Sequence, residues 1–220
     1  MAIVIDLQEE ALKSDADILS LLRKSSLIAR KLDLKDFQEW LNNELNGYRN
    51  GSNIPDYREI RGELKAWNPY HGWIPVVAPN NELETMFNTR RIPDSIPSLN
   101  SLLSEGHSQL SISIPAEMTA YFNKLTDFET VYSLMISKNS LSNIIEQVKN
   151  KILDWAITLE ENGILGEELQ FTTEEKNKAQ SESQIVNYIS NFYGEVFDSQ
   201  IQQGTTNSNQ KAKRNPFKSR

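Results

Sequence analysis

The spacing of apolar residues changes twice along the chain, and this change limits the fold more than any other feature. Apolar residues in the first 47 positions recur at about 3.6-residue intervals, the spacing of a helix with one buried face. We therefore predict three helices there. The first contains Leu7, Ala11 and Leu12, the second follows capping residues at 14–17, and the third runs from an Asp33 cap to a stop at Gly47.

The middle of the chain has the spacing of strands. Apolar and polar side chains alternate at residues 60–66 and again at 110–114, which predicts half-buried strands. Two more strands are predicted at 73–77 and 130–136. Pro75 places the first of these at a sheet edge, because proline cannot donate to a strand ladder. Short helices are predicted between the strands, at residues 80–88, 95–104 and 116–124.

The clearest helical stripe comes late in the chain, at residues 145–159. It predicts a core helix packed across the sheet, with Ser140 or Ser142 as its cap and Gly163 as its end. A surface helix is predicted at 172–181. We therefore expect an α+β protein with an N-terminal helical bundle, a small mainly antiparallel sheet flanked by helices, and a C-terminal β segment.

Aromatic and β-branched residues crowd into positions 185–201, which predicts two strands that turn near Tyr193 and Gly194. Six of the twelve residues at 199–210 are Asn or Gln, whose amides can form ladders between chains. The segment either self-associates or folds back as a hairpin with a frayed polar end. The residues expected to carry self-association are Phe192, Tyr193, Ile201, Gln202 and Gln203. We divide the chain into an α+β domain at 1–181, this β segment at 182–204 and a disordered basic tail at 205–220.

Charge is unevenly distributed. Positions 1–198 hold 18 basic and 30 acidic residues, a net charge of −12, whereas positions 199–220 carry +5. An acidic body binds nucleic acid poorly, because phosphate neutralisation supplies most of that affinity. A nucleic acid partner is therefore not expected, although the basic tail together with the aromatic turn leaves that function as a third possibility.

The sequence contains few of the patterns that carry chemistry. It has no cysteine, which excludes disulfides, thiolate metal sites and a cysteine nucleophile, and fits a reducing cytoplasm. Neither His71 nor His107 has metal-ligand spacing, and no nucleotide-binding glycine motif or serine-hydrolase elbow occurs. Carboxylates at 160–161 and 167–168 are interpreted as a solvated surface rather than a general acid–base pair. We predict no metal, no cofactor and no catalytic residue, and we find no signal peptide or membrane span.

The most distinctive stretch is residues 67–75, with two tryptophans, a tyrosine, a histidine and two prolines. It could form a rigid aromatic platform for a ligand or partner, built from Trp67, Asn68, Tyr70, His71 and Trp73. We favour the plainer interpretation, in which both tryptophans pack into the sheet core and the turn only joins two strands.

Three stretches resemble the AbiTii domain of bacterial abortive-infection proteins. They are Glu44-Leu45-Asn46-Gly47-Tyr48, then residues 66–75 (AWNPYHGWIP), then residues 155–167 (WAITLEENGILGE). The resemblance spans residues 3–180 and implies a cytoplasmic bacterial protein of phage defence. It implies no known catalytic mechanism and carries over no catalytic residue. The C-terminal residues 191–205 resemble, less specifically, short β motifs of bacterial defence and signalling proteins, some of which mediate like-with-like assembly.

The leading functional hypothesis is a non-enzymatic antiphage protein that acts through protein–protein association. We expect a homo-oligomer formed through the C-terminal β segment, with a phage or host protein as a further partner. The alternative is a toxin-like enzyme acting on nucleic acid or a nucleotide through the turn at residues 67–73, with Tyr70, His71 and nearby carboxylates as its site.

Overall fold

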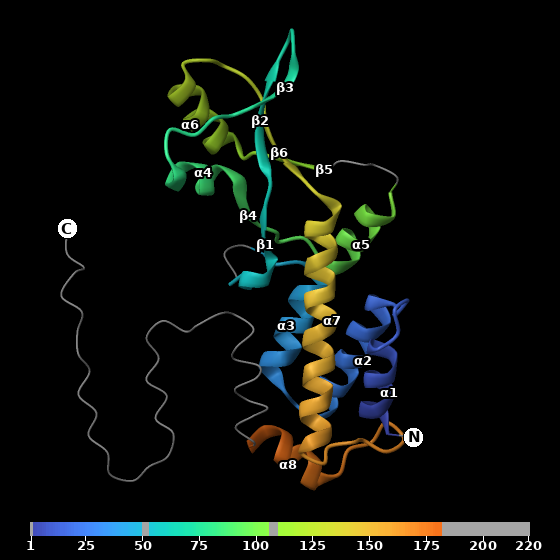
Figure 1. The fold of residues 1–220 in the computed structure, drawn as a ribbon. Coiled ribbons are helices and arrows are strands. Elements are labelled where there is room, and N and C mark those ends of the chain that lie inside the picture. The colour runs from blue at the N-terminus through green and yellow to red at the C-terminus, as the bar shows by residue number, and fades with distance from the viewer. Residues whose placement is uncertain (1, 50–52, 106–109, 182–220) are drawn as a thin grey trace, which may run out of the picture.

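A computed structural model describes residues 2–49, 53–105 and 110–181, which form a helical bundle and a small sheet stacked end to end (Figure 1). The expected α+β class is confirmed. His107 and all five residues expected to carry self-association lie outside the described residues. The proposed division at residue 181 stays a prediction.

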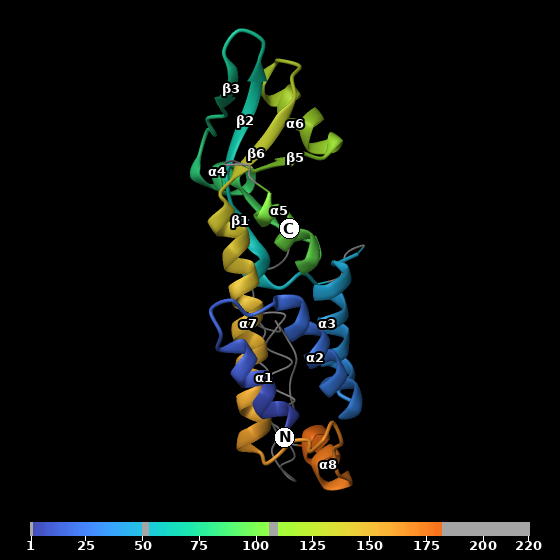
Figure 2. The same cartoon turned by 90° about the vertical axis from the view of Figure 1, so that its right-hand side faces the viewer.

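The bundle is built around one long helix. Helix α7 (Lys138–Glu161) runs down its whole length, with α1 (Ile3–Ala11), α2 (Ile18–Lys31) and α3 (Lys35–Asn46) packed around it (Figure 2). The rings of Phe37 on α3 and Trp155 on α7 lie 4.0 Å apart between centroids, and both side chains are fully buried. Burying residues of this size supplies much of the driving force for folding.

The sheet has four antiparallel strands in the order β3–β2–β6–β5. Its strands are β2 (Glu63–Asn68), β3 (Gly72–Pro75), β5 (Leu110–Ser113) and β6 (Tyr132–Ile136). Helices α4 (Asn81–Asn88) and α6 (Ala116–Thr126) cover one face, where Phe87 and Phe122 make an edge-on ring contact at 4.7 Å. The predicted edge position of Pro75 is confirmed, since β3 is the outermost strand.

A narrow waist joins the sheet to the bundle. It contains η1 (Asp56–Arg58), the short antiparallel pair β1 (Glu59–Arg61) and β4 (Thr89–Arg91), and helix α5 (Ile96–Ser104), which packs against α7. Helix α8 (Thr173–Ser181) lies at the opposite end of the bundle, where the Gln180 side chain donates to the Leu32 carbonyl at 3.1 Å. Among the helices described, none is long and apolar enough to cross a membrane.

Helix α7 corrects the prediction that the late helix packs across the sheet. It leaves the end of β6 and runs away from the sheet, so its apolar stripe faces α1, α2 and α5 instead. Its periodicity indicated a buried face correctly, but periodicity does not say which layer covers that face.

Two predicted helix caps are also wrong, whereas others are confirmed. Asp33 has a left-handed backbone (φ 56°), and Leu34 takes the position before α3. Ser137, rather than Ser140 or Ser142, caps α7 by accepting a hydrogen bond from the Ser140 amide. Asp17 caps α2 as expected, accepting from the amides of residues 19 and 20.

The strand predicted at residues 60–66 is two strands, β1 and β2, separated by Gly62. A Cβ at Gly62 would lie 2.5 Å from the Met135 carbonyl oxygen and 2.8 Å from Cγ of Leu134. The Gly62 amide donates to the Asn88 carbonyl at 2.8 Å, so the chain changes partner from β4 to β6 at this point. Only glycine lets the β6 backbone come this close.

We expect Gly62→Ala to lower the free energy of unfolding by about 3 kcal/mol, the upper end of the usual cost of overpacking, because a backbone atom cannot move aside. Gly163→Ala is the matched control. Its φ of +71° strains an alanine, but no described atom lies within 4 Å of the new Cβ, so we expect a loss of about 1 kcal/mol. Urea denaturation of both variants measures the difference. Equal losses would contradict the close approach of the two strands.

Candidate functional site

The turn between β2 and β3 is held by one side chain. Oδ1 of Asn68 accepts hydrogen bonds from the backbone amides of Tyr70 at 2.9 Å and His71 at 3.1 Å. Gly72 completes the turn with a left-handed backbone (φ +72°). Asn68 was predicted as part of a ligand platform, and the structure uses its carbonyl oxygen to fix the shape of the hairpin.

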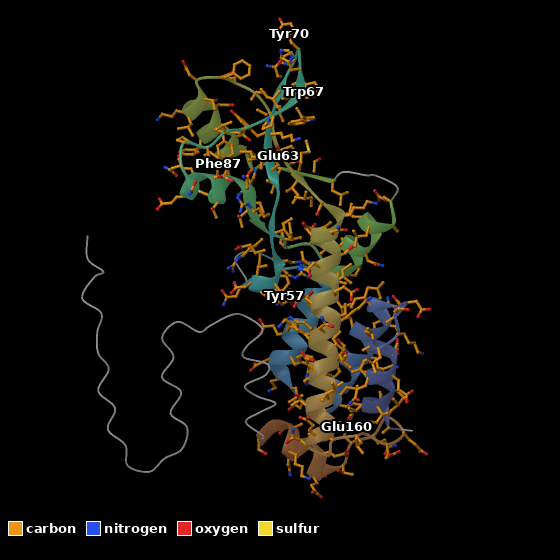
Figure 3. The ribbon with its side chains drawn as sticks, viewed as in Figure 1. Tyr57, Glu63, Trp67, Tyr70, Phe87 and Glu160 are labelled. Carbon is orange, nitrogen blue, oxygen red and sulfur yellow. The ribbon has the colours of Figure 1, made fainter. Side chains whose placement is uncertain are left out.

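The two tryptophans lie opposite each other on adjacent strands and outside the core. Trp67 pairs with Trp73 in the register of β2 and β3, and their rings meet edge to face with centroids 5.4 Å apart. Trp67 is 44% exposed, Trp73 38% and Tyr70, at the tip, 91%. Figure 3 shows Trp67 and Tyr70 at the end of the hairpin farthest from the bundle. The interpretation that we favoured, with both tryptophans in the sheet core, is therefore wrong.

The alternation of side chains along β2 explains why Trp67 is exposed. Side chains alternate between the faces of a strand, so Leu64 and Ala66 face α4 and α6, whereas Trp67 faces the other way. The amide of Trp67 donates to the Val131 carbonyl at 2.9 Å, which continues the register of β2 and β6 and sets Val131 beside Trp67. Val131 is 63% exposed, so Trp73 on β3, Trp67 on β2 and Val131 just before β6 form one apolar row. We call this row, together with Tyr70, the aromatic hairpin surface.

The rest of this sheet face is mostly polar and nearly neutral. Lys65 makes an ion pair with Glu63 at 3.0 Å, and Ser111 and Ser113 are exposed on β5. On β6 between them, Ser133 is buried and Met135 is half-buried. A face with one lysine that is already paired lacks the positive charge that phosphate binding needs. His71 is exposed in the turn, outside any desolvated site of the kind in which acid–base groups work best. In the described part of the chain, no three His, Cys, Asp or Glu side chains are grouped to hold a metal ion.

A buried polar cluster that the sequence patterns did not predict lies at the waist. Glu44 on α3 and Arg58 in η1 are both fully buried, and Nη2 of Arg58 lies 2.5 Å from Oε2 of Glu44. Oε1 of Glu44 accepts from the hydroxyls of Tyr48 at 2.6 Å and Tyr57 at 2.5 Å. The indole of Trp40 donates to the Tyr57 hydroxyl at 2.8 Å. This set of residues is the Glu44–Arg58 cluster.

Arg58 also connects the cluster to the start of α5. Its Nη1 donates to the carbonyls of Ile92 at 3.0 Å and Asp94 at 2.7 Å, and its guanidinium lies 4.7 Å from the centre of the Tyr48 ring. A buried ion pair is tolerated only when further hydrogen bonds satisfy both ions, and here they do. Side chains of α3 and η1 and the backbone of the β4–α5 connection are therefore held at one point, so the cluster fixes the waist.

The first of the three AbiTii-like stretches contains part of this cluster, namely Glu44 and Tyr48, with Gly47 between them. Gly47 ends α3 with φ +86°, and a Cβ there would lie 3.0 Å from the Pro93 carbonyl. A sequence signal for a buried Glu44 exists: it stands four residues after Trp40 and three after Leu41, on the apolar face of α3. No comparable signal points to Arg58, since η1 has no periodicity.

Two carboxylates at the α8 end of the bundle have structural partners, Glu160 on α7 and Glu175 on α8, and Glu161, Glu167 and Glu168 are exposed. Glu160 accepts from the Gln8 side chain at 2.9 Å. Glu175 accepts from the amides of Leu165 at 2.9 Å and Gly166 at 3.0 Å. Burial raises the pKa of Glu175, but these hydrogen bonds and those from the amide and hydroxyl of Thr172 outweigh it and hold the pKa below its ordinary value. A lowered pKa is the opposite of what a general acid needs.

We expect Arg58→Met to lower the free energy of unfolding by about 3–5 kcal/mol, because it leaves the buried carboxylate of Glu44 without its cation. The double variant Glu44→Gln/Arg58→Met leaves neither charge unpaired, so we expect it to lose less than the sum of the two single variants. Urea denaturation at neutral pH measures the cycle. Additive losses would show that the two side chains do not act as a pair.

The tyrosines of the cluster predict alkaline sensitivity. Burial raises the pKa of both Tyr48 and Tyr57 above the ordinary value of 10, and the charge of Glu44 raises them further. The folded protein keeps both protons where the unfolded chain loses them, so this stabilisation is complete below pH 10 and is lost as the pH rises above 10. We expect about 1.4 kcal/mol less stability per pH unit for each tyrosine. Denaturation across this pH range measures the slope, which Tyr48→Phe/Tyr57→Phe should flatten.

Comparison with known proteins gives one match. No curated protein and no solved structure is significantly similar to this chain. The sequence profile of the AbiTii family matches residues 2–184, which include the bundle, the waist, the sheet and all three stretches that carried the resemblance. The chain belongs to the AbiTii family.

Proposed function

We propose that this protein acts in phage defence by binding another protein through the aromatic hairpin surface, rather than by catalysis. Membership of the AbiTii family implies abortive-infection defence against phage. The observation that carries the association mechanism is the exposure of Trp67, Tyr70 and Trp73 together, at the end of the molecule farthest from the bundle. Tryptophan and tyrosine are the residues that most often dominate binding energy at protein interfaces.

The hairpin has a fixed shape before any partner binds. Asn68 ties down the turn, Trp67 and Trp73 pack against each other, and Thr130 donates to the Trp67 carbonyl at 2.6 Å from the neighbouring chain segment. A preorganised surface loses little conformational entropy on binding, which supports affinity from a small contact area.

Charge supports a protein partner over a nucleic acid. The aromatic hairpin surface contains no charged side chain, and the nearest lysine on its face, Lys65, is paired with Glu63. Stacking on aromatic rings binds single strands when a positive groove follows the phosphates, and this face does not provide one. The expected occupant is an uncharged, apolar segment of a phage or host protein.

Self-association through residues 185–204 is the second part of the proposal. The aromatic and amide-rich composition of that segment, with Phe192, Tyr193, Ile201, Gln202 and Gln203, supports pairing between chains. A homo-oligomer would present several copies of the hairpin at once, and this multivalency would raise the apparent affinity for a repetitive partner such as a phage assembly.

We expect Trp67→Ala/Trp73→Ala to abolish most protection in a phage plaquing assay, because losing two interface anchors costs about 2 kcal/mol or more, about thirtyfold in affinity. Tyr121→Ala is the matched control, since Tyr121 is an aromatic residue of similar exposure (46%) on α6, away from the open face. Thermal denaturation checks that both variants fold. Full protection by a folded double variant would contradict the proposal.

His71→Gln separates association from catalysis within the same assay. It keeps a polar side chain in the turn but removes acid–base chemistry. Association predicts that protection survives this change. Loss of protection in His71→Gln, with Trp67→Ala/Trp73→Ala still protective, would support the toxin-like enzyme instead.

A further inference from the structure

The hydrogen-bonding pattern of the strands shows which residues direct their backbone N–H and C=O groups outward at the two edges of the sheet. In an antiparallel sheet, alternate residues of a strand bond to one neighbour and the others point to the opposite side. The Trp67 amide donates to the Val131 carbonyl, so odd-numbered residues of β2 and β6 bond to each other. The Val76 amide donates to the Leu64 carbonyl, which confirms that even-numbered residues of β2 bond toward β3.

The same alternation continues to β5. Even-numbered residues of β6 point toward β5, so Leu134 and Ile136 bond with Ile112 and Leu110. Ser111 and Ser113 therefore direct their backbone N–H and C=O groups away from the sheet. Within the described residues, no strand lies beyond β5 to receive them.

The two edges differ in how they are protected. On β3 the outward positions are Trp73 and Pro75, and proline removes one of the donors that a further strand would need. On β5 the four residues Leu-Ser-Ile-Ser include neither proline nor charge, the two common devices that block edge pairing. The open edge of the sheet is therefore β5.

A second copy of β5 fits this edge. If two antiparallel β5 strands meet on a twofold axis at Ile112, Ser111 of each copy lies opposite Ser113 of the other. These two residues are the ones whose backbone N–H and C=O groups point away from the sheet. Each Ser111–Ser113 pair can then exchange two hydrogen bonds, with Ile112 beside Ile112 at the axis. The identical strand is thus self-complementary, as a twofold interface requires.

Charge and burial favour the same partner. Two bodies with a net charge of −12 repel, but the β5 edge itself is uncharged, so the strands can meet without like charges in contact. Leu110 and Ile112 are only half buried on the helix-covered side of the sheet, and a neighbouring strand would bury them further.

We propose that β5 pairs with β5 of a second copy, joining two four-stranded sheets into one eight-stranded sheet. This interface lies within residues 110–113 and is separate from self-association through residues 185–204. It also leaves the aromatic hairpin surface free, because that surface includes the opposite edge of each sheet.

Opposite charge patterns at Ser111 and Ser113 test the pairing. Both side chains are exposed, so the variants should fold. All measurements use the full chain carrying Ile201→Asp, which disrupts pairing through the C-terminal segment. In light scattering across a concentration series, we expect the Ile201→Asp protein, which is the parent for the other variants, to be a dimer. We expect Ser111→Lys/Ser113→Lys to be a monomer, because the lysines of one copy would then lie opposite the lysines of the other. Ser111→Lys/Ser113→Glu should remain dimeric, because each lysine then faces a glutamate of the other copy.

Each other outcome overturns the β5 proposal. A monomeric parent means that C-terminal pairing accounts for any assembly of the unmodified chain. A dimeric Ser111→Lys/Ser113→Lys places the interface elsewhere, and a monomeric Ser111→Lys/Ser113→Glu rejects the antiparallel register. None of these results bears on the hairpin, which the plaquing assay tests separately.

Oxidative cross-linking then tests the twofold axis, because the chain has no cysteine of its own. Ile112→Cys should form an intermolecular disulfide readily, since directly opposed residues without hydrogen bonds between them lie about 4.5 Å apart at Cα. Ser111→Cys is the control, since its counterpart in the second copy is a diagonal neighbour about 7–8 Å away. Equal cross-linking of the two variants would overturn the proposed register.

Discussion

The buried ion pair between Glu44 and Arg58 holds the waist on which the rest of the structure depends. Two charges without access to water would be costly, and the cost is offset because Tyr48, Tyr57 and the carbonyls of the β4–α5 connection complete their hydrogen bonds. Apolar packing alone is tolerant of small rotations between layers. A network with fixed donors and acceptors is not, so it sets one orientation of the sheet on the bundle.

That orientation places the sheet as an extension of the bundle rather than as a layer on its side. Helix α7 leaves β6 directly, so the long helix and the central strand form one continuous support. With α4 and α6 on one face only, the other face of the sheet remains available for contacts, and within the described residues so does its β5 edge. The proposed hairpin contact and the proposed β5 pairing follow from this single-sided covering.

Local patterns predicted local features well. The 3.6-residue spacing identified every helix of the bundle, the Asp17 cap and the Gly163 stop are confirmed, and Pro75 marked the edge strand. The failures concern contacts between distant segments. Asp33 and Ser140 looked suitable as caps, but the start of a helix also depends on where the preceding chain enters, and Leu34 and Ser137 take those positions. The amide of Gly62 bonds to Asn88, far away in the sequence, which explains why one predicted strand became two.

The sequence by itself determined the type of the longer elements, their two faces and the family of the protein, because periodicity, turn residues and motifs are local properties of the chain. The short elements η1 and β4 had no such signal. Only the tertiary structure decided that Trp67 and Trp73 are exposed, since alternation names two faces but does not say which one the helices α4 and α6 cover. It also decided that Glu44 meets Arg58. A charged residue in a short helical turn carries no sign of its partner, and the pairing arises from the way that α3 and η1 pack together.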